Sequence, residues 1–184
     1  MTDLGQEKTE LLDMLDLRRN FLLRTVEGLT DEQASATPTA STLCLAGLVK
    51  HVTANEAGWV DFMRHGPAAK ADEDWGAIDW DAIADGRQEM PAWLAEQQAQ
   101  WRLADGETLT DLVGSMNEQA AHTRIVVTDL DLDRKHDLPE APWFETGAQW
   151  SNREVLLHLI GETAQHAGHA DIIRETIDGQ RTMG

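Results

Sequence analysis

The sequence of 184 residues is long enough for one domain with its own hydrophobic core, and we expect a single domain over residues 1–184. Its 33 acidic and 15 basic residues give a formal net charge of −18. This charge argues against nucleic acid and membranes as partners, because DNA, RNA and anionic lipid all select clustered lysine and arginine. There is no apolar run near the roughly 20 residues of a membrane-spanning helix and no secretory signal at the N-terminus. The one cysteine cannot form an internal disulfide, so we expect a cytoplasmic protein.

Four long segments carry apolar residues at the spacing of an amphipathic helix. In chain order they cover residues 4–28, about 42–65, 107 to about 130, and about 152–178. Ser41 or Thr42 is the expected N-cap of the second helix, and Ser151 or Asn152 marks the start of the fourth. The stretch from Thr30 to Glu32 opens a short turn or helical stub after the first helix.

Two long connections, 66–106 and 131–150, are interrupted by glycine and proline and lack this periodicity. Residues 92–103 are the one stretch within them that fits a short helix. No segment of the sequence shows strand-like alternation. The sequence therefore predicts an all-α fold, a four-helix bundle with long connections, and these connections are candidates for one end of a site.

Tryptophan is the one large aromatic residue that the sequence uses repeatedly, with seven tryptophans, three phenylalanines and no tyrosine. The tryptophans are Trp59, Trp75, Trp80, Trp93, Trp101, Trp143 and Trp150. Several lie in stretches rich in glycine, aspartate and proline, where we expect them to anchor loops by burying area. Stacking against a ligand is the alternative.

The last predicted helix concentrates potential metal ligands on one face. At about 100° per residue, His158, Glu162, His166 and His169 fall within about an 80° arc. His166 lies inside the apolar stripe of this helix and Glu162 lies on its border, where uncompensated burial is costly. A carboxylate and an imidazole four residues apart can hold one divalent ion. Helix geometry alone allows the pairs 158/162, 162/166 and 166/169 and does not choose among them.

His51 is the best candidate for a third ligand, because it lies along the edge of the apolar stripe of the second predicted helix. If two such stripes face each other in a bundle, His51 approaches the Glu162/His166 pair. The alternative is a metal-free bundle in which these histidines are bonded to core carbonyls.

The remaining candidates are weaker. His65, His122 and His136 lie beside loops or polar runs, and we expect them to be solvent-exposed. Cys44 has no evident basic neighbour that would make it a thiolate nucleophile.

The candidate ligands His51, Glu162 and His166 lie in segments that resemble the DinB-like superfamily of metal-binding four-helix bundles. The segments are Leu45–Trp59, Trp101–Leu109 and Glu162–Gly179. Within the superfamily, the sequence is most similar to the actinobacterial mini-circle-protein branch and is related to the N-terminal domains of mycothiol-dependent maleylpyruvate isomerases. The resemblance covers nearly the whole chain and implies up-down-down-up topology and a homodimer.

In that superfamily one metal ligand comes from the second helix and two, four residues apart, come from the last. Carried over, these ligands are His51, Glu162 and His166. Many members have histidine in place of Glu162, whereas the isomerases also use glutamate. The resemblance implies a supporting role for His158 beside the metal and places His169 at the pocket or against a ligand, and Trp59 and Arg174 are further candidates for pocket residues.

The resemblance implies an open site for one divalent ion (zinc, nickel or iron) that binds a low-molecular-weight thiol, which is mycothiol in actinobacteria. Such an ion lowers the pKa of the thiol beside an electrophile. We therefore expect a metal-dependent thiol S-transferase or related detoxification enzyme that acts on a small electrophile. The alternative is a non-catalytic metal-binding bundle acting as a binding or stress-response protein. The isomerases carry an additional C-terminal domain without counterpart here, so their isomerisation is not expected.

Overall fold

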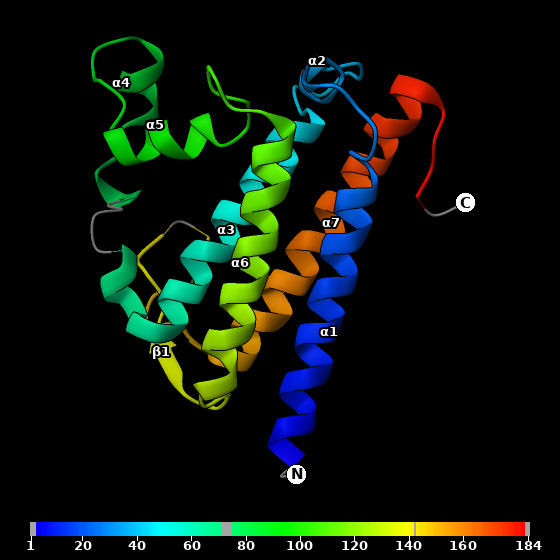
Figure 1. Ribbon diagram of the computed structural model, residues 1–184. Coiled ribbons are helices and arrows are strands. Elements are labelled where there is room, and N and C mark those ends of the chain that lie inside the picture. The colour runs from blue at the N-terminus through cyan, green and yellow to red at the C-terminus, as the bar shows by residue number, and fades with distance from the viewer. Residues whose placement is uncertain (1–2, 71–74, 142, 183–184) are drawn as a thin grey trace.

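Four long helices pack into a bundle in the computed structural model, which describes residues 3–70, 75–141 and 143–182. They are α1 (Asp3–Arg24), α3 (Leu45–His65), α6 (Leu109–Asp129) and α7 (Asn152–Asp178). Figure 1 shows that α1 and α7 run in one direction and α3 and α6 in the other, so the topology is up-down-down-up. The predicted all-α four-helix bundle is confirmed. None of the described helices is both long and apolar enough to span a membrane.

Polar side chains cap several of the described helices, and Thr30 and Ser151 do so where the sequence predicted a start. Thr30 caps the short helix α2 (Asp31–Ser35), and Thr108 and Ser151 cap α6 and α7, each through a reciprocal capping box. The cap of α3 is Cys44, whose sulfur accepts a hydrogen bond from the backbone N–H of Gly47. The expected cap at Ser41 or Thr42 is wrong, because the Ser41 hydroxyl accepts from the Leu43 N–H in a preceding turn.

The two long connections hold short elements. The first contains the 3₁₀ turns η1 (Gly66–Lys70) and η2 (Trp75–Ala77), then α4 (Trp80–Ala84) and α5 (Ala92–Ala99). The second contains the strands β1 (Lys135–Asp137) and β2 (Gln149–Ser151), which pair antiparallel. The expectation of no strands is wrong, since three residues are too few to show alternation. In Figure 1, α4 and α5 lie outside the bundle beside α3 and α6.

His136 in β1 is buried, which overturns the expectation that it is solvent-exposed. Its Nε2 lies 3.1 Å from the Met63 carbonyl oxygen, and its ring packs edge-on against Phe62. Strand pairing turns this side chain inward and ties the hairpin to the end of α3. His65 and His122 are exposed, as predicted.

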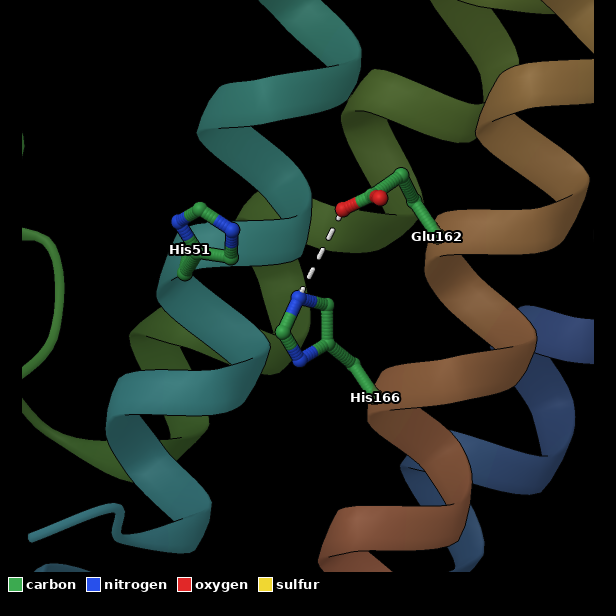
Figure 2. Close-up of side chains that lie close together, drawn as sticks. All are labelled: His51, Glu162 and His166. Carbon is green, nitrogen blue, oxygen red and sulfur yellow. Dashed lines mark ion pairs between the residues drawn. The ribbon is translucent and has the colours of Figure 1, made fainter. Parts of the chain in front are cut away.

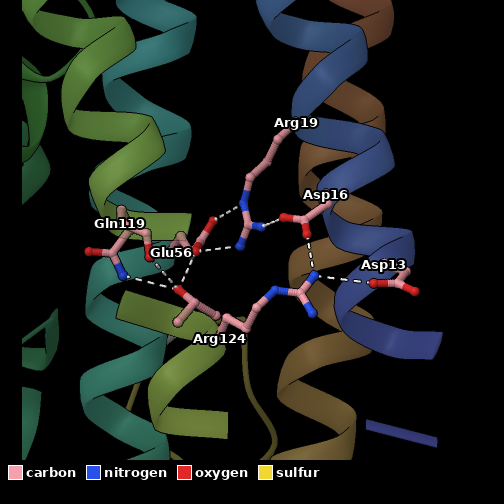
Figure 3. Close-up of polar contacts among 7 residues, drawn as sticks. Asp13, Asp16, Arg19, Glu56, Gln119 and Arg124 are labelled. Atoms are coloured by element: carbon pink, nitrogen blue, oxygen red, sulfur yellow. Dashed lines mark hydrogen bonds and ion pairs between the residues drawn. The ribbon is translucent and has the colours of Figure 1, made fainter. Parts of the chain in front are cut away.

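A buried ionic network joins α1, α3 and α6 (Figure 3). Arg19 and Glu56, 3% and 2% exposed, form two hydrogen bonds of 2.8 and 2.6 Å. The Thr123 hydroxyl also donates to Glu56, and Asp16 accepts from Arg19. Arg124, which is exposed, pairs with Asp16 at the rim. Removing either member of a buried pair leaves the other charge buried without compensation. The network therefore fixes how α1 and α3 pack.

Replacing Glu56 by alanine should lower the free energy of unfolding by about 3 kcal/mol, because Arg19 would lose the carboxylate that faces two of its nitrogens. Urea denaturation followed by circular dichroism measures this loss. The matched control is Asp13→Ala, which removes a partner of the exposed Arg124 and should cost less than about 1 kcal/mol. Equal losses in the two variants would contradict a stabilising role for the buried pair.

Candidate metal centre

His51 on α3 meets Glu162 and His166 on α7 in the middle of the bundle. One potential ligand atom from each residue lies within 4.8 Å of the other two. Figure 2 shows Glu162 and His166 reaching from α7 toward α3, with 3.6 Å between Glu162 Oε2 and His166 Nε2. The i, i+4 spacing puts both side chains on one face of α7, and the packing of α3 against that face brings in His51. Of the three pairs that helix geometry left open, the structure sets 162/166, the pair implied by the family resemblance, opposite His51.

The protonation of these groups suits a divalent ion. Burial, with the nearby His166 ring as a second cause, lowers the pKa of His51 to about 4, although Glu162 acts in the opposite direction. The contact with His166 lowers the pKa of the Glu162 carboxyl against the effect of burial. The site thus presents a neutral imidazole and a carboxylate at pH 7, which are the forms that bind metal. The buried Nδ1 of His51 has no hydrogen-bond partner among the described residues. A buried nitrogen without a hydrogen bond costs free energy, and a bound ligand would offset this cost. The residues therefore fit a metal ion.

Trp101 holds the His51 ring, a role that the sequence pattern did not reveal. The two rings stack with centroids 3.8 Å apart and planes 17° from parallel. The Trp101 backbone lies so close to α3 that a Cβ on Gly47 would be 1.9 Å from its carbonyl oxygen. Cys44 Sγ lies 3.6 Å from the same oxygen and donates to it. The thiol of this buried cysteine therefore acts in structure, at the base of the stack.

A cavity of about 640 Å³ opens beside the cluster. It is walled by α3, α5, the start of α7 and the loop between the two strands. Its aromatic and acidic lining residues are Trp59, Trp75, Trp93, Trp101, Trp143, Phe144, Glu96 and Glu162. Five of the seven tryptophans thus face one cavity, Trp59 from α3 and the other four from the two long connections. These tryptophans are therefore placed where they could contact a ligand, and stacking against a ligand stays a prediction.

The other predicted site residues divide into two groups. His158 and Trp59 both line the cavity, and their rings pack edge to face with centroids 5.0 Å apart. Burial lowers the pKa of His158. His169 lies behind the cluster, with its Nδ1 3.5 Å from Nδ1 of His166.

Arg174 is not brought to the cavity. Its guanidinium donates to the backbone oxygens of Thr25 and Glu27 at 2.8 and 2.9 Å and pairs with Asp178. It therefore ties the end of α7 to the turn that follows α1. Arg174 is buried in this contact.

An up-down-down-up bundle with a His/Glu/His cluster between its second and fourth long helices defines a DinB-like metal-site scaffold. The chain belongs to the mycothiol S-transferase family, whose model matches residues 10–179. The fold is similar to the crystal structure of a conserved protein from Enterococcus faecalis, with a TM-score of 0.64 and 14% sequence identity. That similarity covers 94% of this chain and 97% of the other. Among curated proteins there is no significant match. The predicted DinB-like resemblance is confirmed.

Acidification should destabilise the metal-free protein through His51. Its pKa is about 4 in the folded chain and near 6.5 when unfolded, so protons favour the unfolded state as the pH falls from about 6.5 to 4. The loss should reach on the order of 1–2 kcal/mol at pH 5. The measurement is urea unfolding of wild type and His51→Gln at pH 7 and pH 5 in the presence of a chelator. An equal pH dependence of the two proteins would contradict this assignment.

Replacing Gly47 by alanine should displace the Trp101 backbone and loosen the stack on His51. We expect the free energy of unfolding to fall by about 1–3 kcal/mol and zinc affinity to fall with it. Urea unfolding and calorimetric zinc titration measure the two effects. The control is Gly114→Ala on α6, where a Cβ meets nothing within 4 Å and a gain of about 0.5–1 kcal/mol is expected. Unchanged zinc affinity in Gly47→Ala would show that the stack does not position the ligand.

Proposed function

We propose that this protein is a metal-dependent S-transferase that joins a mycothiol-type thiol to a small electrophile. The observation that carries the proposal is the His51/Glu162/His166 cluster, whose members His51 and Glu162 also line the 640 Å³ cavity. Membership of the mycothiol S-transferase family supports the choice of thiol. A structural metal site is closed by protein ligands, whereas three ligands at a cavity wall leave a position for substrate.

His51, Glu162 and His166 would hold one divalent ion, and zinc, nickel and iron all accept such a set of two imidazoles and a carboxylate. When bound, the ion supplies Lewis acidity that lowers the pKa of a thiol in the cavity. The low pKa of His51 keeps its imidazole neutral and available at physiological pH. Its stacked partner Trp101 limits rotation of the ring, so little conformational freedom is lost on binding.

The cavity suits a neutral, sugar-bearing thiol. Among the described residues that line it, the amides of Asn55, Gln97 and Gln100 offer donors and acceptors for hydroxyl groups. No described lining residue is a lysine or arginine. Glutathione, which carries two carboxylates, would find no cation there and should be a poor substrate.

The reaction is a substitution at carbon. The thiol proton leaves to water, the sulfur forms a bond to the electrophilic carbon, and the bond from that carbon to its leaving group breaks with both electrons going to the leaving group. The protein's part is to hold thiol and electrophile together in a partly closed cavity, which removes much of the entropic cost of a two-substrate reaction.

Metal content and thiol transfer should be lost together when a ligand is removed. We expect near-stoichiometric metal in untagged wild type and on the order of 100-fold or more weaker binding in His51→Ala, Glu162→Gln and His166→Ala. Elemental analysis and calorimetry measure the metal, and transfer of mycothiol to monochlorobimane, with release of chloride, measures activity. His122→Ala, on the exposed face of α6, is the control and should behave as wild type.

Activity in metal-free His166→Ala would overturn the proposal. Stoichiometric metal without transfer of mycothiol to any electrophile would instead favour a non-catalytic metal-binding bundle. If wild type binds neither zinc, nickel nor iron, the cluster is a set of core histidines and the proposal fails.

A further inference from the structure

The cavity has a second aromatic end, formed by three tryptophans from three separate segments. Trp75 of η2 lies between Trp93 of α5 and Trp143 of the loop between the strands, with ring centroids 4.6 and 4.5 Å apart. Both contacts are edge to face, at 72° and 74°. Trp143 is 59% exposed even though it lines the cavity. A large aromatic surface that is left this open has more area than loop anchoring requires.

This end of the cavity is negative. Glu96 follows Trp93 by three residues on α5, so both project from the same side of that helix, and both line the cavity. Glu96 is exposed, and no ion pair links it to another described residue. The described lining contains no lysine or arginine that would compensate the carboxylates of Glu96 and Glu162.

We propose that the Trp75/Trp93/Trp143 cluster binds the electrophile and selects planar aromatic molecules that carry a positive charge. This inference rests on the proposed function and names the substrate class of the same site. Tryptophan faces attract both flat rings and cations, and the Glu96 carboxylate adds an attraction that only a cation exploits. A neutral aromatic retains the stacking alone. An anionic aromatic meets two carboxylates and no positive side chain of the described lining.

The two ends of the cavity would bind different substrates. His51, Trp101 and Glu162 form the end at which the thiol would bind, with Trp101 packed against His51. The Phe144 ring contacts both Trp143 and Trp59, and Trp59 packs against His158, one turn before Glu162 on α7. A thiol at one end and an aromatic electrophile at the other would meet in the same cavity, and the chemistry is the substitution described above.

The test uses three naphthalenes that differ in one substituent: trimethylammoniomethyl, hydroxymethyl or carboxylate. Their dissociation constants are measured by calorimetry with full-length protein at pH 7.5, with chelator and without thiol. We expect the cation to bind most tightly and the anion about tenfold or more weakly. Glu96→Gln should weaken the cation about threefold and leave the hydroxymethyl compound unchanged. The control is Glu89→Gln, which removes an equal charge from an exposed residue outside the cavity lining and should change neither.

A second pair of variants tests the aromatic surface. Trp143→Leu should weaken all three naphthalenes, whereas Trp80→Leu, at a tryptophan that is 51% exposed and outside the cavity lining, should weaken none. Both side chains are exposed, so both variants should fold. Anion binding as tight as cation binding, no binding of any naphthalene, or equal effects in Glu96→Gln and Glu89→Gln would each overturn the proposal. The binding test contains neither metal nor thiol, so it is independent of the transfer assay. Selective binding of the cation in a protein that transfers no thiol counts against the proposed function alone. Thiol transfer by a protein that does not bind the cation selectively counts against this inference alone.

Discussion

The packing of α3 against α7 is the constraint on which the site depends. Two helices that run in opposite directions place His51 opposite an i, i+4 pair, and neither helix alone supplies all three side chains. Glu56 lies five residues after His51, about 140° further around α3, and there it is fixed by Arg19 and Thr123. One face of α3 is thus held by a buried ionic network while another presents a ligand to α7. The position of His51 is a consequence of the packing of the whole bundle.

The buried polar groups of the bundle fall into two kinds. Glu56 and His136 have partners that account for their burial, since one is bonded to Arg19 and the other to a backbone oxygen. His51 is half-buried beside a cavity, with an unpartnered buried nitrogen and a lowered pKa. A satisfied buried group stabilises or orients the fold. An unsatisfied one at a cavity wall carries a cost that binding can offset, and it therefore indicates where a ligand belongs.

The connections between the helices build most of the cavity wall. Residues 75–103 contribute Trp75, Trp93 and Trp101, and the loop between the strands contributes Trp143 and Phe144. His136 holds the hairpin of that loop against the end of α3. The helices thus supply the candidate metal ligands, and the connections supply the surface that would contact substrates. This division lets one helical scaffold carry different specificities, because connections tolerate change more readily than a packed core.

The sequence by itself determined the four helices, because their apolar periodicity and capping residues are local properties. It also narrowed the candidate ligands to a few residues, since imidazole and carboxylate in an apolar stripe need a partner wherever the stripe packs. Helix spacing alone did not choose among the pairs 158/162, 162/166 and 166/169, because it is similarly favourable for each, and it was the family resemblance that implied 162/166.

The tertiary structure set the 162/166 pair opposite His51, which is the pair that the family resemblance implied. It also turned His136 inward through a three-residue strand pairing, stacked Trp101 on His51 where Gly47 permits close approach, and bound Arg174 to the turn after α1 instead of to the cavity. Each of these outcomes depends on contacts between residues distant in sequence, and such contacts leave no periodic pattern in the sequence itself.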